Sequence, residues 1–516
     1  MSQAKKLFDS AAATTYNREG FQAYNRSVEE EYVQLLLTNT FANTFYADQQ
    51  QLIAEARSMH ELMLELDAEF MARALVFARN KGFMRLQPLY GLALLSKARP
   101  DLFAAVFTRV VRIPSDLADF LTILRGLGRG QGGRAVKRQV TRFLGGVSEY
   151  WALKYNGRGR GFSLGDAIAT AHPKPHNEQQ RALYRYLCGQ EADLSQLPQL
   201  HALECFKRAT TDDERIRYIR AGKLPYETVT STVQPSKRLW IELMQQMPAF
   251  ALLRHLNTLH RQGVFTSSGT HKARKLKTEQ LDYVRRRLHD TEALRKAKIL
   301  PFRFAHAYYE VELPELRAIL AEAVDLTFHN VPSLPGRTAI FLDISGSMTG
   351  EYLQTGSIFA LALYKKTSGN SLFWTFDTLV QDVHPSRDES IMKQAERIRA
   401  RGGTDTGAPV RELIRQKYKV DQIIMITDEQ QNTGSPFYRE LQTYRQSVNR
   451  DAKAFIIDIA PYRSTMTPPD DLRTFYIYGW SDTVLSFIAH TSRGFGGMVN
   501  AVQQVELESQ EEQNDH

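Results

Sequence analysis

An aspartate and two serines stand together directly after a strongly apolar stretch, at Asp343, Ser345 and Ser347. The apolar stretch Ala339–Leu342 is typical of a buried strand, so we expect the three side chains at its carboxyl end, where open α/β sheets bind ligands. Carboxylate and hydroxyl oxygens are hard donors, which suit Mg²⁺ or Mn²⁺ better than zinc. The motif predicts part of a divalent-cation site.

Two later elements complete the predicted cation site. A glycine-rich turn with hydroxyl side chains, residues 402–407, opens a helical pattern, and Asp428 follows another apolar, strand-like run. Because parallel strands end at the same edge of a sheet, we expect both elements beside Asp343. Since three of the five ligands that these elements offer are neutral hydroxyls, a vacant position on the ion could accept an anionic oxygen from a partner.

The same residues argue against an enzyme. The sequence has no motif of a P-loop nucleotide site, a zinc protease or a serine hydrolase. Nuclease sites gather several carboxylates around one or two ions, whereas this set is rich in hydroxyls. Asp405 and Glu429 flank this set of residues. Either both add negative charge to the site, or Asp405 stabilises the turn and Glu429 is an exposed carboxylate at the end of a strand. We expect no catalysis, with a metal-dependent nuclease as the less favoured alternative.

A strongly basic segment, residues 125–176, carries ten Lys or Arg and only two acids. Val136, Val140, Phe143 and Leu144 fall on one side of a predicted helix, which we expect to be buried. The same helix carries four cations, which predict a ridge that can bind a phosphate backbone. These cations are Arg134, Lys137, Arg138 and Arg142. A solvated helix surface is the alternative, and the scarcity of acids makes it less favoured.

The loop after this helix is rich in glycine, arginine and aromatic residues, and it contains Lys154, Arg158 and Arg160. Such a loop can follow an irregular RNA backbone and stack on unpaired bases. Further on, His172 precedes a proline and is either a helix C-cap or an RNA contact. The glycine pattern at 128–133 matches the dinucleotide-binding G-x-G-x-x-G, but a helical pattern precedes it, so we predict a turn between helices.

Two kinds of sequence pattern predict the helices and strands that hold these residues. From about residue 25 to 330, apolar residues recur at helical spacing in runs such as 29–37, 62–79 and 117–124, which predicts stacked helices of an α-solenoid. After a Pro/Gly linker, helical patterns alternate with buried strands, which predicts a doubly wound α/β domain. The expected strands are 338–343, 371–376, 421–427, 453–459 and 473–478, and the predicted domains are 1–330 and 331–516.

Charge is distributed unevenly between these domains. Residues 1–330 hold 47 basic and 34 acidic side chains, and residues 331–516 hold 19 and 23. A basic helical domain favours a polyanionic partner. The chain has no apolar run long enough to cross a membrane, no apolar core of a signal peptide and only two cysteines. We therefore expect a cytoplasmic protein without a membrane partner.

Both regions resemble known modules. Asp343-Ile344-Ser345-Gly346-Ser347, together with Thr404 and Asp428, resembles the metal-ion-dependent adhesion site (MIDAS) of von Willebrand factor A domains. The run Lys154-Tyr155, Gly161-Phe162-Ser163 and Ala171-His172-Pro173-Lys174-Pro175 resembles the TROVE module of telomerase-associated, Ro and vault proteins, as do residues 247–254 and 296–302. A helical module followed by an A domain is similar to the bacterial form of the Ro family.

The resemblance implies a fold and a function. Ro-family proteins are rings of HEAT-like helical repeats closed by the A domain, with small noncoding Y RNA on a basic outer surface and single-stranded ends of structured or misfolded RNA in the hole. The resemblance also implies roles in RNA quality control, in rRNA maturation and in RNA decay with an exoribonuclease. Lys154, Arg158 and His172 would contact Y RNA, although one extra loop residue makes Arg160 an alternative to Arg158. A different function would be a protein-interaction scaffold whose metal ion captures an acidic ligand.

Overall fold

The computed structural model describes residues 13–39, 48–130, 132–155, 162–266, 278–296, 301–328, 333–460, 462, 464–468, 471, 473–478 and 498–507. Contacts between residues divide the chain into two compact units. Unit 1 comprises residues 1–87, 300–305 and 324–506, and unit 2 comprises residues 88–299, 306–323 and 507–516. None of the helices in these described stretches is long and apolar enough to cross a bilayer.

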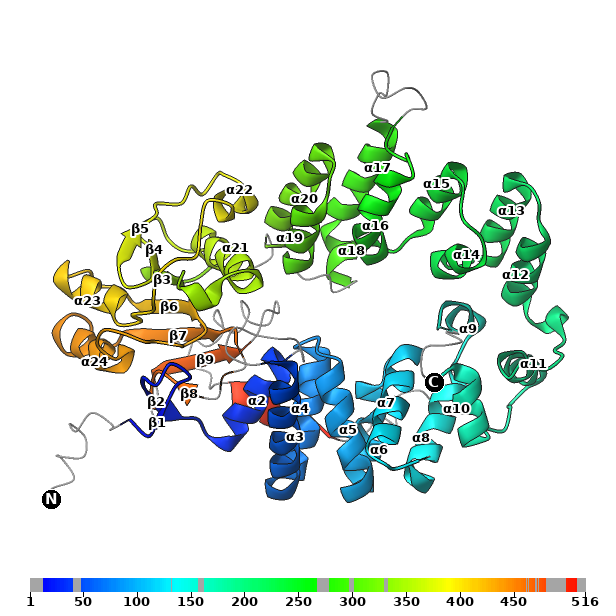
Figure 1. Ribbon diagram of the computed structural model, residues 1–516, viewed down its shortest axis with the longest axis horizontal. Coiled ribbons are helices and arrows are strands. Elements are labelled where there is room, and N and C mark those ends of the chain that lie inside the picture. The colour runs from blue at the N-terminus through cyan, green and yellow to red at the C-terminus, as the bar shows by residue number, and fades with distance from the viewer. Residues whose placement is uncertain are drawn as a thin grey trace. The chain divides into compact units, whose positions relative to one another are not determined.

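A six-stranded sheet forms the centre of unit 1. Its order is β5-β4-β3-β6-β7-β9, and β5 alone runs antiparallel to its neighbour. Every residue of β3 and β6 is buried, because α21 covers one face and α23 and α24 the other (Figure 1). The strands are β3 (Thr338–Asp343), β4 (Leu372–Phe376), β5 (Val380–Asp382), β6 (Gln422–Thr427), β7 (Lys453–Asp458) and β9 (Thr474–Tyr478); the helices are α21 (Glu351–Lys365), α22 (Ile391–Ala395), α23 (Ala408–Arg415) and α24 (Phe437–Ser447).

The doubly wound α/β domain predicted from the sequence is confirmed. Each of the five expected strands is present, with its ends within one residue of the expected ones. The additional strand β5 was not predicted, because it has three residues and none of them is buried. An apolar sequence pattern reveals a strand only when the side chains of that strand are buried.

The N-terminal residues of the chain also belong to unit 1. Strand β2 (Gln22–Asn25) pairs with β1 (Thr15–Tyr16) on one side and with β8 (Ser464–Thr465) on the other. Helices α2 (Val28–Thr38), α3 (Gln49–Leu66) and α4 (Ala68–Asn80) follow, and α26 (Met498–Gln503) packs on α2 and α4. The single helix expected over 62–79 is wrong, because Asp67 ends α3 and accepts the Phe70 N–H, 2.8 Å away, to cap α4.

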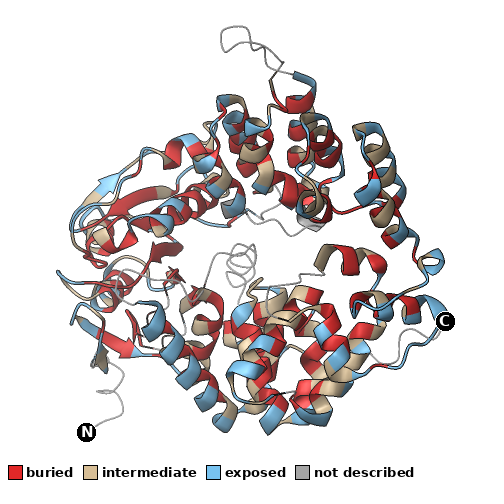
Figure 2. Cartoon of the chain, turned by 45° about the vertical axis from the view of Figure 1, so that its right-hand side comes forward, coloured by how far each residue is buried: buried red, intermediate tan, exposed pale blue. Residues whose placement is uncertain are grey.

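Unit 2 is built from short helices that pack on their neighbours, as predicted. Helix α8 contacts α6 and α10, and α13 contacts α12 and α15. Figure 2 shows the helices buried on one side and exposed on the other. They are α6 (Pro100–Val110), α7 (Pro114–Gly126), α8 (Gly133–Gly145), α9 (Glu149–Tyr155), α10 (Leu164–Ala171), α11 (Glu178–Leu187), α12 (Pro198–Arg208), α13 (Asp212–Gly222), α14 (Tyr226–Thr232), α15 (Lys237–Gln246), α16 (Ala249–Arg261), α17 (Thr278–His289) and α18 (Thr291–Lys296), while α5 (Leu86–Ala98), α19 (Pro301–Glu310) and α20 (Pro314–Thr327) have residues in both units.

Candidate functional site

The two aspartates of the predicted cation site end neighbouring strands of the α/β domain. Strands β3 and β6 are parallel and pair in register, with Leu342 opposite Ile426. Asp343 is the last residue of β3, and Asp428 directly follows β6. Both side chains are fully buried. The sheet register therefore places the two carboxylates at one edge, as the sequence predicted.

The three hydroxyl residues lie at the same edge. The Oγ atoms of Ser345 and Ser347 are 3.3 Å apart. The loop that contains Thr404 is attached to this turn, since the Gly346 N–H donates to the Gly402 carbonyl over 3.1 Å. Ser345, Ser347 and Thr404 are all buried. The structure thus brings the five predicted ligands to one place.

The electrostatics of this edge favour a cation. Asp343 accepts hydrogen bonds from the Ser345 N–H at 2.9 Å and the Thr427 hydroxyl at 2.6 Å, but burial still raises its pKa. Burial and the nearby charge of Asp343 raise the pKa of Asp428 to about 7. Among the described residues, Asp428 Oδ2 is buried without a hydrogen-bond partner. A bound cation would both satisfy this oxygen and remove the repulsion between the carboxylates.

The donor types narrow the class of cation that fits. Within the described stretches, no three His, Cys, Asp or Glu side chains form a group that could hold a metal ion. A cation at this edge would therefore need the three hydroxyls in addition to the two carboxylates. All-oxygen coordination suits Mg²⁺ or Mn²⁺.

The two acids beside this site have structural roles. Asp405 Oδ1 accepts the N–H groups of Gly407 and Ala408 at 3.1 and 3.0 Å, which is the turn-stabilising alternative. Glu429 is not the exposed carboxylate that the sequence suggested. It is buried and forms a 2.6 Å ion pair with Arg26, a residue more than 400 positions away in the sequence.

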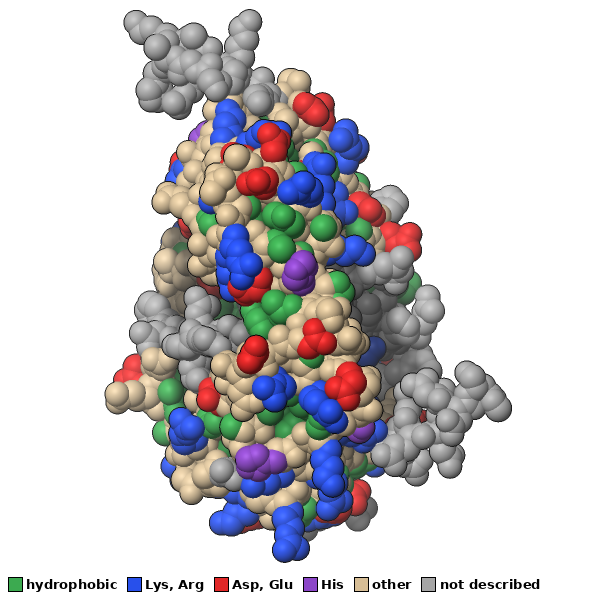
Figure 3. All heavy atoms as spheres, turned by 90° about the vertical axis from the view of Figure 1, so that its right-hand side faces the viewer, with side chains coloured by type: hydrophobic (Ala, Val, Ile, Leu, Met, Phe, Trp, Pro, Cys, Tyr) green, Lys and Arg blue, Asp and Glu red, His purple; other side chains and the backbone are tan. Residues whose placement is uncertain are grey.

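The predicted basic ridge lies on α8. Val136, Val140 and Leu144 are buried as expected, whereas Phe143 is half-buried and stacks on Trp151 of α9 at 5.9 Å. On the other side of the helix, Arg134, Arg138 and Arg142 are exposed and Lys137 is half-exposed. Figure 3 shows Lys and Arg side chains crowded at the lower end of this face of unit 2, with few acids between them.

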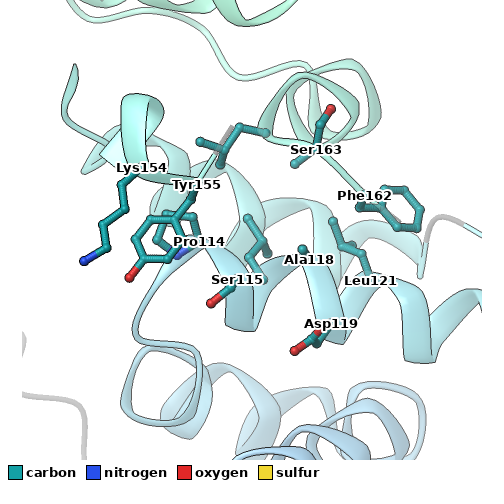
Figure 4. A pocket seen from close by; sticks show the side chains of 12 residues that line it. Pro114, Ser115, Ala118, Asp119, Leu121, Lys154, Tyr155, Phe162 and Ser163 are labelled. Atoms are coloured by element: carbon teal, nitrogen blue, oxygen red, sulfur yellow. The ribbon is translucent and has the colours of Figure 1, made fainter. Parts of the chain in front are cut away.

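Lys154, at the end of α9, borders a pocket of about 220 Å³. Figure 4 shows Ser115 and Asp119 of α7 facing this pocket, with Tyr155 beside Lys154 and Phe162 across from them. The Lys154 Nζ lies 5.8 and 5.6 Å from the ring centres of Tyr150 and Tyr155 and 3.7 Å from a Glu227 oxygen. Aromatic rings beside a lysine at a pocket are suited to stack an unpaired base near its phosphate.

A second pocket, of about 370 Å³, is lined in part by two residues that lie near Lys154, and it was not predicted. Tyr150, Tyr226 and Glu227 line it together with the exposed Lys223. Tyr226 packs edge-on against His255 at 4.8 Å. Tyr150 belongs to α9, Tyr226 and Glu227 belong to α14, and Lys223 follows α13, so no local sequence pattern could have joined Tyr150 to the others.

Of the three remaining predicted RNA contacts, the structure describes one. His172 is the C-cap of α10, with a left-handed φ of 53° and its N–H donated to the Ile168 carbonyl, and its side chain is exposed. Arg158 and Arg160 lie outside the described residues. The glycine pattern at 128–133 follows the helix α7, which confirms a turn between helices rather than a dinucleotide site.

Comparisons with known proteins match both regions. Residues 337–491 match the Ro60 vWA domain, and residues 220–325 match the TROVE domain. The chain is 25% identical over 518 residues to the RNA-binding protein RO60 of Deinococcus radiodurans, covering 93% of this chain and 95% of that protein. It is 24% identical over 307 residues to the RNA-binding protein RO60 of Caenorhabditis elegans, covering 54% and 45%. The crystal structure of the Deinococcus radiodurans RO (RSR) protein has the same fold, with a TM-score of 0.67 and 23% identity over 90% of this chain and all of that one.

Proposed function

We propose that this chain, whose residues 220–325 match the TROVE domain and whose residues 337–491 match the Ro60 vWA domain, is a noncatalytic, cytoplasmic RNA-binding protein of the Ro60 family. Its RNA would include small noncoding Y RNA on the basic surface and single-stranded ends of structured or misfolded RNA in the hole of a helical ring. Its role would be RNA quality control, rRNA maturation and decay with an exoribonuclease. These finer assignments rest on the family resemblance.

The basic ridge on α8 is the observation that carries the proposal of RNA binding. Its four cations project from a helix whose opposite side is packed. Among the described residues, no acidic side chain forms an ion pair with Arg134, Lys137 or Arg138, so their charge is available to phosphates. Binding through such cations releases counterions, which gives an affinity that falls as salt rises.

The two pockets around Lys154 support a single-stranded ligand. Duplex RNA hides its bases, whereas unpaired bases can stack on tyrosine and histidine rings. Tyr150 contributes to one pocket and stands beside the lysine that lines the other. Stacking on one aromatic side chain is worth about 1–3 kcal/mol per base.

We expect the protein to bind a structured RNA with a 3′ single-stranded tail more tightly than a blunt duplex of equal length. Replacing Lys154, Arg158 and Arg160 by alanine should weaken binding of the tailed RNA by about tenfold or more and make the salt dependence shallower. Gel shifts over a salt titration measure both quantities. A matched control removes the same charge from exposed cations that already pair with acids, Arg181, Lys207 and Arg238.

Two results of this titration would contradict the proposed site. One is equal, weak binding of both RNAs by the wild type and by the variant, since the positive charge would then only solvate the surface. The other is an equal loss of affinity in the control variant, since net charge rather than position would then explain binding.

For the α/β domain we propose a Mg²⁺ or Mn²⁺ site held by Asp343, Ser345, Ser347, Thr404 and Asp428. The unpartnered oxygen of Asp428 and the two repelling carboxylates support it. The ion would supply a vacant position for a partner's anionic oxygen. With only two carboxylates it is poorly suited to activate water, which supports ligand capture over nuclease activity.

We expect Mn²⁺ to raise the melting temperature of the protein and EDTA to reverse the rise, because an ion that binds only the folded state adds about 2.7 kcal/mol at one hundred times its Kd. Asp343→Asn should abolish the rise. Asp382→Asn is the control, since it removes an exposed carboxylate of β5 from the same domain. An undiminished rise in the Asp343 variant would place the ion elsewhere.

One observation favours a protein-interaction scaffold as the second candidate function. Leu379 is 69% exposed, in the turn between β4 and β5. The same turn is attached to the loop of the cation site, because the Asp405 N–H donates to the Asp377 carbonyl at 2.9 Å. An exposed apolar side chain on a turn attached to the loop of the proposed cation site would suit a protein segment that carries Asp or Glu. Equal, weak binding of both RNAs in the titration above would favour this function.

A further inference from the structure

The three residues that follow Asp428 all contact the N-terminal segment, which we define as residues 13–27. These contacts join parts of the chain more than 400 residues apart. They are an ion pair from Arg26 to Glu429 at 2.6 Å, a hydrogen bond from the Arg18 N–H to Gln430 Oε1 at 2.9 Å, and one from the Asn17 side-chain amide to the Gln431 carbonyl at 2.7 Å.

Arg26 is the most buried of the three N-terminal residues that make these contacts. Its Nη2 donates to Glu429 at 2.6 Å and to Asp458 at 2.6 Å, and its Nη1 donates to the Tyr478 hydroxyl at 2.8 Å. The second oxygen of Glu429 accepts the Met466 N–H at 2.9 Å. The guanidinium is therefore enclosed between the last strands of the sheet, which holds the N-terminal segment firmly in place.

The contacted loop in turn fixes Asp428. The Gln430 N–H donates to Asp428 Oδ1 at 3.2 Å, and the Gln430 side-chain amide donates to the Asp428 carbonyl at 3.1 Å. Glu429 has a left-handed φ of 60°, which a non-glycine residue keeps only where surrounding contacts hold it. A shift of residues 429–431 would consequently move the Asp428 carboxylate.

We propose that the N-terminal segment is a clasp on residues 429–431 that positions Asp428, so that its docking and cation binding at the α/β domain reinforce each other. The inference rests on the cation site proposed above. Asn17 and Arg26 act in it as positioning residues, because neither is a ligand of the ion. Coupling of this kind is reciprocal: a docked clasp tightens cation binding, and a bound cation tightens the clasp.

The test uses Asn17→Asp in the full-length protein. Asn17 Oδ1 accepts the N–H groups of Glu19 and Phe21 at 3.0 and 2.9 Å, and a carboxylate keeps both bonds while turning the donor to Gln431 into a repelling oxygen. Charge attraction alone would tighten cation binding in this variant. The control is Arg18→Ala, which removes the side-chain pair with Glu55 but keeps the backbone bond to Gln430.

Mn²⁺ affinity is measured by titration calorimetry in the wild type and both variants. We expect Asn17→Asp to weaken it about fivefold or more and Arg18→Ala to leave it unchanged. In the wild type, Mg²⁺ should also slow hydrogen exchange of the amides in residues 14–25, a readout that does not depend on any variant folding. Equal Mn²⁺ affinity in all three proteins, or unchanged exchange in residues 14–25, would overturn the clasp while leaving the cation site. No Mn²⁺ binding by the wild type would overturn the cation site and the clasp with it.

Discussion

A variant with alanine at Arg134, Lys137, Arg138 and Arg142 is expected to bind RNA about 100-fold more weakly than the wild type at about 0.1 M salt. Each lost phosphate contact lowers the slope of log affinity against log salt by about 0.7 to 0.9, so the slope should become shallower by about 3. These side chains project from the exposed side of α8, and alanine favours a helix, so the fold should be retained. Gel shifts or fluorescence anisotropy over a salt series measure the slope.

A matched variant separates the position of these charges from their number. Alanine at Arg181, Lys207, Arg238 and Arg261 also removes four exposed cations from unit 2, but each of these pairs with an acid. Its slope should stay close to that of the wild type, because a cation already neutralised by a carboxylate releases few counterions. Identical slopes in both variants would show that α8 is not the phosphate-binding surface.

Replacing Arg26 by methionine is expected to destabilise unit 1 by about 3–5 kcal/mol, because it leaves the charges of Glu429 and Asp458 buried without their partner. A loss of this size lowers the melting temperature by roughly 10 °C. Thermal unfolding followed by tryptophan fluorescence detects it, since Trp374 of β4 is fully buried in the same unit. Arg18→Ala, which breaks a partly exposed ion pair with Glu55, should cost under about 1 kcal/mol.

A triple variant tests the cause of this loss. Adding Glu429→Gln and Asp458→Asn to Arg26→Met removes the uncompensated charges and should recover part of the lost stability. A triple variant less stable than Arg26→Met alone would mean that packing, rather than unpaired charge, accounts for the effect of Arg26.

The α/β domain and the gathering of the five proposed ligands at one edge of its sheet could be predicted because their signals are local. Asp343, Thr404 and Asp428 each stand at the end of a recognisable element, and parallel strands bring such ends to one edge of the sheet. The buried face of α8 was equally visible, since Val136, Val140 and Leu144 repeat at the spacing of a helix.

The features that escaped prediction depend on partners far away in the chain. In the sequence, Arg26 is one more cation before a helix, and only the fold shows that its charge is buried between Glu429 and Asp458. Tyr226 resembles any half-buried tyrosine until the fold sets it beside Tyr150 at a pocket. Periodicity reports which side of an element is buried, but it does not report what the element packs against.

The distance in sequence between Arg26 and its partners has a consequence for synthesis of the chain. Glu429 follows Arg26 by 403 residues and Asp458 by 432. A ribosome that adds about 5–20 residues per second takes roughly 20 to 80 s to cover the first of these intervals. During this time the nascent chain carries strand β2 without its partner β8, and an arginine without its carboxylates. Residues around Arg26 thus wait for partners that are made more than 400 residues later, and a chain truncated before Asp458 leaves them open to chaperones and proteases.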